Sequence, residues 1–253
     1  MKKIFFFFCI LSSTIFVAQT NTKSLFDDAN LLYKEGKFNE AIKLYKQIEA
    51  KDSVSSNLYY NLGNSYYKLN NVANTIYNYE KALLLDPLNK DAANNLAFAK
   101  RMTIDNIEVL PKTFLQKFEV NYIQKLSYNQ WAMLSIIFSI LGSTLFLLFY
   151  FSTISNKKRI YFLTSIASFL FLIISVFTTY HQYQKFINTK YAIVFSPKIS
   201  VNNAPTLNSD EIFELHEGTK VNVLDAVDNW KKIKLSDGKI GWVSIDDIKM
   251  LTD

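Results

Sequence analysis

Cysteine, histidine and glycine are scarce in this chain, which has one, two and six of them among 253 residues. A lone cysteine, Cys9, can form neither a disulfide within the chain nor a thiolate metal cluster. His181 and His216 have no second ligand at helical spacing, which argues against a zinc site. No glycine-rich phosphate loop, nucleophile elbow or paired catalytic carboxylates can be identified. We therefore expect a protein that is not an enzyme and has no cofactor and no metal.

An excess of acidic residues is also lacking, and the formal net charge is +6. The excess positive charge is not clustered on one soluble segment. Most of it lies beside apolar segments, at Lys2 and Lys3, in residues 152–159, and at Lys185 and Lys190. Positive charge in such places sets membrane orientation, so nucleic acid is not an expected partner.

The N-terminus has the pattern of an export signal. Lys2 and Lys3 form a positive head, and residues 4–18 form a short apolar run. Residues 1–19 are therefore predicted to be a signal peptide. Phe16 is bulkier than the small residue preferred two positions before the cut, so retention as an anchor stays open. Either outcome exports the residues that follow.

Two further apolar runs predict transmembrane helices at residues 131–151 and 160–180. The first has about 21 residues, which span about 31 Å as a helix. The loop between them, residues 152–159, contains three basic residues and no acidic one, which favours the cytoplasm. We expect a hairpin in a bacterial inner membrane, with both flanking domains periplasmic and the lipid bilayer as a partner. A buried hairpin in a soluble protein is the alternative, but nothing else in the chain is large enough to cover it.

Two linkers are expected beside the membrane, residues 103–130 and 181–190. The first mixes aromatic residues with balanced charge, which is typical of an amphipathic segment lying at the membrane surface.

Residues 20–102 repeat with a period of 34, the period of tetratricopeptide (TPR) repeats. The paired positions are Ala29 with Gly63, Tyr33 with Tyr67, Ala41 with Thr75, Tyr45 with Tyr79, and Ile48 with Ala82. The resemblance to TPR proteins implies repeats at residues 22–55 and 56–89 and a capping helix at 90–102. So short a solenoid is marginally stable, and we expect it to lean on a partner or a second copy of the chain.

In TPR proteins the first helix of each pair lines a concave groove. That resemblance implies a groove lined here by Asn30, Tyr33, Lys34, Tyr60, Asn64, Tyr67, Lys68, Asn94 and Arg101. Amide, phenol and ammonium groups can bind an extended peptide, the amides pairing with its backbone and the lysines with a carboxylate. The alternative is a solvated face with no fixed ligand.

From residue 191 on, the pattern changes to short alternating stretches that predict strands of a small barrel, residues 191–253. Asp237-Gly238 predicts a tight hairpin turn. The segment from Val201 to Val243, with its late Gly241-Trp242, resembles the bacterial SH3-like (SH3b) domain. Asn202 stands where that family usually has arginine. Trp230 and Trp242 are candidates for a surface that binds peptide or glycan, the alternative being ordinary packing.

The predicted fold is thus multi-domain: an all-α TPR solenoid, a two-helix transmembrane hairpin and a small all-β SH3-like barrel. This order of parts resembles the BatE proteins of the Bacteroides aerotolerance (Bat) operon. The resemblance implies a scaffold for envelope stress tolerance, with other Bat membrane proteins as partners, some with von Willebrand factor A domains. A homo-oligomer is a further expectation. The alternative function is binding of peptidoglycan by the barrel.

Overall fold

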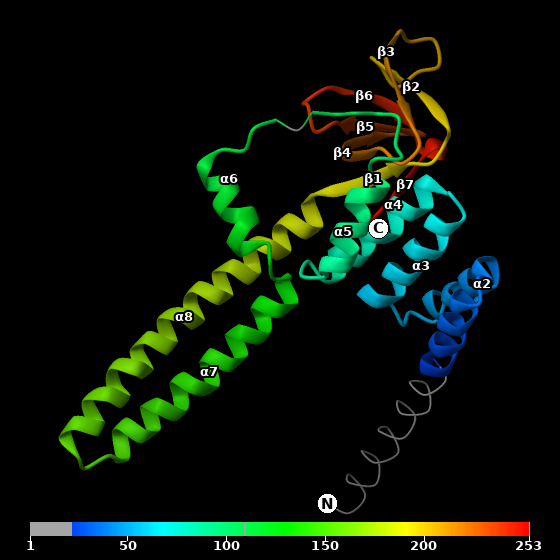
Figure 1. The fold of residues 1–253 in the computed structure, drawn as a ribbon. Helices are drawn as coiled ribbons and strands as arrows, with labels where there is room; N and C mark the ends of the chain where they lie inside the picture. Colours follow the sequence, from blue (N-terminus) through cyan, green and yellow to red (C-terminus); the bar gives the residue numbers. More distant parts are fainter. Residues whose placement is uncertain (1–21, 109, 253) are drawn as a thin grey trace, which may run out of the picture. The chain divides into compact units, whose positions relative to one another are not determined.

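The computed structural model describes residues 22–108 and 110–252. It divides into two units. One contains the described residues up to Leu85, residues 89–108 and residues from Tyr191 on, and the other contains residues 86–88 and 110–190. Figure 1 follows the chain through both. The predicted signal peptide, residues 1–19, lies outside the described residues.

Five helices form the repeat region. They are residues 22–34, α2 (Phe38–Glu49), α3 (Ser56–Lys68), α4 (Val72–Leu85) and α5 (Lys90–Ala99). Ser55 caps α3 by accepting a hydrogen bond from the Leu58 amide, and Asn89 caps α5 in the same way. The turns after the helices at residues 34 and 68 each contain a residue with positive φ, Gly36 and Asn70. These two positions are one period apart, so the turns repeat along with the helices.

The repeats pack through residues that recur with the same period. Tyr45 and Tyr79 are both fully buried, one in each repeat. A Cβ at Gly63 would lie 2.6 Å from two ring carbons of Tyr79, far inside van der Waals contact. Glycine at position 63 therefore lets α3 and α4 approach closely.

The other unit is a helical hairpin preceded by a short helix. Its elements are α6 (Phe114–Phe118), a π-helical turn η1 (Glu119–Ile123), α7 (Tyr128–Phe151) and α8 (Ser155–Asn188). α7 and α8 lie side by side along their length (Figure 1). By length and composition both are candidate membrane spans, and most of their apolar side chains are exposed.

Local sequence explains where these two helices begin and end. Ser127 and Gln130 form a capping box, so α7 begins three residues before the predicted span. α8 begins at Ser155 and continues to Asn188, through residues expected to be a linker. Residues 181–188 contain neither proline nor glycine, so nothing in them ends the helix.

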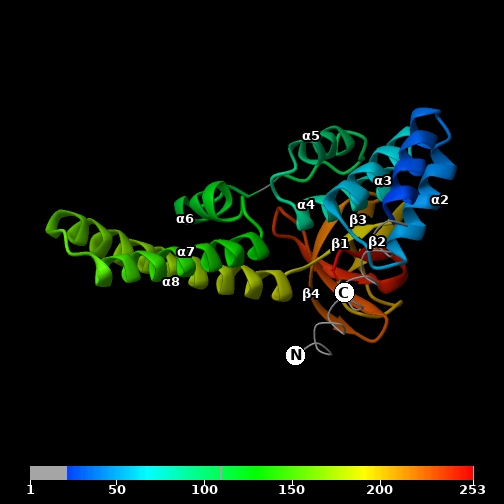
Figure 2. The same cartoon turned by 90° about the horizontal axis from the view of Figure 1, so that it is seen from below.

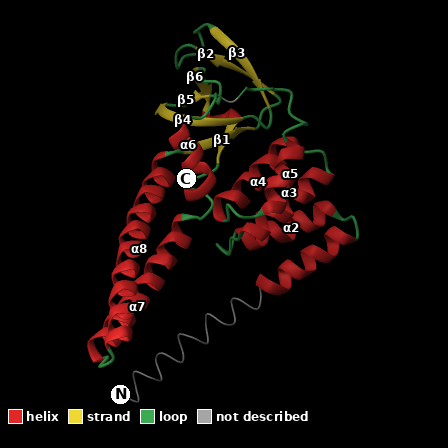
Figure 3. Cartoon of the chain, turned by 60° about the vertical axis from the view of Figure 1, so that its left-hand side comes forward, coloured by secondary structure: helices red, strands yellow, loops and turns green. Residues whose placement is uncertain are grey.

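The C-terminal segment contains the strands, drawn in yellow in Figure 3. They are β1 (Lys190–Val194), β2 (Lys198–Asn202), β3 (Glu211–His216), β4 (Lys220–Val227), β5 (Trp230–Lys234), β6 (Ile240–Ser244) and β7 (Ile248–Met250). They form one seven-stranded sheet in the order β3-β2-β6-β5-β4-β1-β7, in which consecutive strands such as β4 and β5 pair antiparallel. Val201, Ile233 and Val243 lie in its core.

A single hydrophobic cluster joins the repeats to the strands. Ile76 and Tyr77 of α4 and Leu96 of α5 pack in it with Ile193 of β1 and with Leu251. Figure 2 shows α4 beside the strands. The short solenoid was expected to lean on a partner or a second copy. In the structure the solenoid packs against the C-terminal sheet of the same chain.

Candidate functional site

A pocket of about 260 Å³ opens on the repeat region. Three helices line it, the helix of residues 22–34, α3 and α5, together with one side chain from α4. Its lining residues are Tyr33, Tyr60, Asn64, Tyr67, Lys68, Tyr79, Asn95 and Phe98. The pocket thus lies where the first helix of each pair was expected to form a groove. Of the predicted groove residues, Asn30, Lys34, Asn94 and Arg101 do not line it.

The two periodic asparagines have the same role in successive repeats. The side-chain oxygen Oδ1 of Asn30 accepts hydrogen bonds from Tyr45 Oη at 2.6 Å and Asn61 Nδ2 at 2.8 Å. One period later, Oδ1 of Asn64 accepts hydrogen bonds from Tyr79 Oη at 2.7 Å and from Nδ2 of an α5 asparagine at 2.9 Å. Their recurrence therefore reflects bonds between helices, because each oxygen ties a buried phenol to the next helix.

The α5 asparagine in that bond is Asn95, whereas the α5 asparagine predicted for the groove is Asn94. Asn94 is exposed and does not line the pocket, and the α5 residue that does so is its neighbour. The reason is the period, because Asn95 follows Asn61 by 34 residues and takes the same place in its helix. Phe98 was also missed. It follows Asn64 by 34 residues, is 54% exposed and forms an apolar side of the pocket.

The pocket presents hydrogen-bond donors to a ligand. Both acceptor positions of the Asn64 oxygen are occupied, which leaves its Nδ2 group to donate. Lys68 contributes an ammonium group. Burial, and next the neighbouring Tyr60, raise the pKa of Tyr33, so that phenol stays protonated at neutral pH. Such a pocket suits a ligand with carbonyl or carboxylate oxygens and an apolar group for the aromatic walls.

The two candidate tryptophans of the sheet share one face. Lys232 of β5 pairs with Trp242 of β6, and Trp230 pairs with Ser244, so all four side chains lie on the same side of the sheet. The Lys232 ammonium lies 5.8 Å from the centre of a Trp242 ring. The core residues of β5 and β6 alternate with them and point the other way. Both indoles are half-buried and belong to no core cluster among the described residues.

Comparison with known families assigns the two ends of the chain. Residues 29–70 match the family described as TPR repeat, and residues 201–249 match the bacterial SH3 domain. The chain has a TPR repeat region and a C-terminal bacterial SH3 domain. A search of curated proteins found no match for the chain. Within residues 22–108 and 110–252, no group of three or more His, Cys, Asp or Glu residues could bind a metal ion.

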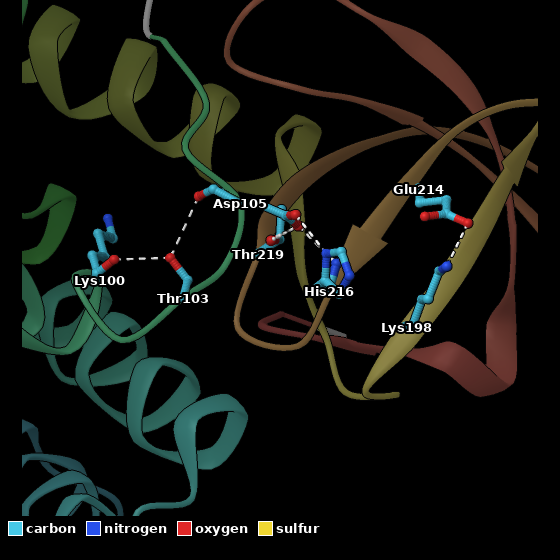
Figure 4. Close-up of polar contacts among 7 residues, drawn as sticks. All are labelled: Lys100, Thr103, Asp105, Lys198, Glu214, His216 and Thr219. Carbon is cyan, nitrogen blue, oxygen red and sulfur yellow. Dashed lines mark hydrogen bonds and ion pairs between the residues drawn. The ribbon is translucent and has the colours of Figure 1, made fainter.

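The segment that follows α5, residues 100–105, contacts the SH3 domain and is called the strap (Figure 4). Asp105 Oδ2 accepts hydrogen bonds from the backbone N–H of His216 at 2.7 Å and from Thr219 Oγ1 at 2.6 Å. Its Oδ1 lies 2.8 Å from Nδ1 of the same histidine. Burial alone would raise the pKa of Asp105, but the Thr219 and His216 hydrogen bonds outweigh it and lower that pKa. The sequence predicted only a linker here.

The turn that Asp105 binds lies against α4. A Cβ at Gly218, whose φ is +85°, would lie 2.9 Å from side-chain atoms of Val72, Ile76 and Thr103. Only glycine combines this backbone conformation with so close a contact. Gly218 therefore allows the SH3 domain to approach the TPR region.

A buried ion pair lies in the same interface. The carboxylate of Glu80 on α4, whose side chain is 8% exposed, lies 2.6 Å from the Lys220 ammonium and 3.0 Å from that of Lys100. Burial would raise the pKa of Glu80, but the two lysines outweigh it and lower that pKa. Lys249 of β7 adds a second contact, with its ammonium 4.3 Å from the Tyr77 ring centre. The two domains thus belong to one compact unit.

Proposed function

We propose that this protein is a membrane-anchored scaffold without enzymatic activity, whose TPR pocket binds an extended segment of a partner protein. The pocket is the observation that carries this proposal. It combines aromatic walls with the donors Lys68, Asn64 and Tyr33, a set suited to the backbone carbonyls and carboxylates of a peptide. The SH3 domain, fixed to the TPR region, provides the scaffold with a second surface.

The shared core supports an even number of membrane crossings. Ile76 and Ile193 pack in one cluster, so residues 22–108 and 191–252 must fold in the same compartment. The chain between them must then cross the membrane twice or not at all. α7 and α8 are two long helices with exposed apolar side chains, and two crossings agree with that constraint. The N-terminal export pattern favours the periplasm for both domains, with the turn before α8 in the cytoplasm.

The order of parts supports a more specific assignment. A TPR region, an apolar helix pair and an SH3 domain follow an export pattern, as they do in the BatE proteins that the sequence resembles. On that basis we assign the protein to a Bat-type envelope complex for aerotolerance or stress tolerance. Its partners are then other Bat membrane proteins, including those with von Willebrand factor A domains.

The test begins with crosslinking in intact cells and mass spectrometry to identify the partner. Recovery of that partner from detergent extracts is then compared for the intact protein and for a variant with Tyr67→Ala and Lys68→Ala. We expect several-fold lower recovery, because the variant loses one wall of the pocket and its ammonium group. Lys43→Ala, an exposed change on α2, is the control and should leave recovery unchanged. Equal recovery with the pocket variant would reject the pocket as the binding site.

The tryptophan face favours one alternative function, binding of peptidoglycan by the SH3 domain. Trp230, Trp242 and Lys232 on one face offer two aromatic surfaces and a cation to a glycan or stem peptide. The full chain in detergent is the proper reagent, because Ile193 and Leu251 pack against the TPR region. Sedimentation with purified sacculi that is lost on Trp230→Ala with Trp242→Ala would favour this alternative. Sedimentation that does not change would leave it without support.

A further inference from the structure

Residues 114–123, which form α6 and η1, carry an apolar face that no other described residue covers. Its side chains are exposed by 82% at Phe114, 76% at Leu115, 49% at Phe118 and 66% at Tyr122. At helical spacing these positions lie within about a third of the circumference. The opposite side contains Val120 and Ile123, which are half-buried. The segment therefore packs within its unit through η1, and its apolar side faces outward.

Specific contacts fix the packed side to the start of α7 and the end of α8. Gln182 Nε2 of α8 donates hydrogen bonds to the carbonyl oxygens of Ile123 at 2.6 Å and Leu126 at 2.9 Å. Trp131 Nε1 of α7 donates to the same Ile123 oxygen at 3.0 Å. The carboxylate of Glu119 lies 2.7 Å from the Lys185 ammonium. These contacts place the segment at the end of the hairpin where α7 begins and α8 ends.

The charges around the apolar face are almost all positive. Glu119 is the only acidic residue in 110–190, and its charge is paired with Lys185. The Lys185 and Gln124 hydrogen bonds lower the pKa of Glu119, although burial opposes them, so this carboxylate is ionised at neutral pH. Lys112, Lys117 and Lys125 remain beside the apolar side chains, and none of them has an acidic partner among the described residues.

We propose that residues 114–123 lie in the surface of the lipid bilayer, with Phe114, Leu115, Phe118 and Tyr122 in the acyl boundary and the lysines among anionic headgroups. This inference rests on the proposed membrane anchoring of α7 and α8. Apolar side chains on one face beside lysines are the features by which a helix binds an anionic membrane surface. The occupant is the bilayer because η1 is bonded to α7 and α8, the proposed membrane spans, and because lysines flank the apolar side chains.

The experiment uses the full chain, with Cys9→Ser, reconstituted in liposomes with and without phosphatidylglycerol. Single cysteines are introduced by Leu115→Cys, by Leu141→Cys in the middle of α7 and by Lys43→Cys on α2, and each is labelled with an environment-sensitive fluorophore. Lipids that carry a spin label near the headgroup or deep in the acyl chain then quench the fluorescence. We expect the 115 probe to be quenched several-fold more by the shallow label than by the deep one. The 141 probe should show the reverse, and the 43 probe should be quenched by neither.

The outcomes separate this inference from the proposed anchoring. A 115 probe that behaves like the 43 probe, while the 141 probe is deep, overturns the inference and leaves the anchoring in place. A 141 probe that neither label quenches overturns the anchoring, and the inference with it. Quenching at 115 should fall several-fold without phosphatidylglycerol, and also when Lys112, Lys117 and Lys125 are changed to glutamine. Unchanged quenching in both cases overturns the preference for anionic lipid.

Discussion

The ammonium group of Lys220 lies 2.6 Å from the carboxylate of Glu80, although 140 residues separate them in the chain. The hairpin of α7 and α8 lies between them in sequence. A buried carboxylate without a partner destabilises a fold. Within the TPR region the partner of Glu80 is Lys100, whose side chain is 50% exposed. Lys220 supplies a second and closer positive charge from the SH3 domain, so this pair makes the stability of the TPR region depend on the other end of the chain.

Replacing that lysine tests the dependence. Lys220→Met should lower the free energy of unfolding by about 3 kcal/mol, because it leaves the Glu80 carboxylate buried with only Lys100 beside it. The measurement is urea unfolding in detergent, followed by circular dichroism. Lys198→Met removes an exposed pair with Glu214 and should change little. Equal effects of the two variants would contradict the role of the Lys220 pair.

The Asp105 strap should make stability depend on pH. The pKa of Asp105 is lowered in the folded state from its ordinary value of 3.8, so its contribution is complete above that value and is lost as the pH falls through the folded pKa. The pKa of Glu80 is also lowered, from 4.5, and it acts in the same direction. We expect the melting temperature to be steady from about pH 7 to 5 and to fall below about pH 4.5.

Asp105→Asn separates the strap from the other acidic groups. The variant should melt earlier at neutral pH, and its melting temperature should fall less between about pH 4.5 and 3. If its melting curve kept the full acid sensitivity, Asp105 would not be a source of the effect.

The asparagine bonds between helices predict a cost in stability that is separate from binding. Asn64→Ala leaves the buried Tyr79 hydroxyl without its acceptor and should cost about 2 kcal/mol. Burial raises the pKa of Tyr79, so the phenol stays protonated and its hydroxyl still needs an acceptor. Asn30→Ala does the same to Tyr45, whose pKa is raised to about 12, and should have a similar cost. Thermal melting measures both, and an effect of Asn64→Ala on partner recovery alone would refute the structural role.

The approach of α3 to α4 predicts coupling between two residues. Gly63→Ala forces a methyl group against the Tyr79 ring and should destabilise the chain by about 2 kcal/mol. In a Tyr79→Leu background that added cost should largely disappear, since the ring is gone. A double-mutant cycle measures the coupling. Additive costs would show that the ring is not what limits position 63.

The period of 34 predicts the repeats, and it extends to polar residues that bond one helix to the next. Asn30 and Asn64 recur, and so do Tyr45 with Tyr79 and Asn61 with Asn95. Three polar positions sharing one period indicate bonds between helices more directly than a ligand, because a partner does not need to repeat. That pattern could also have identified Asn95 instead of Asn94. Tyr33, Tyr60, Asn64, Tyr67 and Lys68 remain predictions for binding, and all five line one pocket.

The contact between the TPR region and the SH3 domain had no local signal. Tyr77 and Ile193 look like ordinary core residues of their own domains, and Asp105 lies in a segment that reads as a linker. Their roles arise from distant pairing, which periodicity and turn chemistry do not report. The SH3 strands, by contrast, were predictable, because alternation and the Asp237-Gly238 turn are local patterns.

The cluster that contains Ile76, Leu96 and Leu251 also has a consequence for biosynthesis. The ribosome completes α4 and α5 about 150 residues before Leu251, a delay on the order of ten seconds at ordinary rates of translation. Throughout that interval the apolar side of α4 is uncovered, because Ile193 and Leu251 have not yet been synthesised. Truncation near the C-terminus would therefore leave this side of the first domain uncovered and expose the domain to proteolysis.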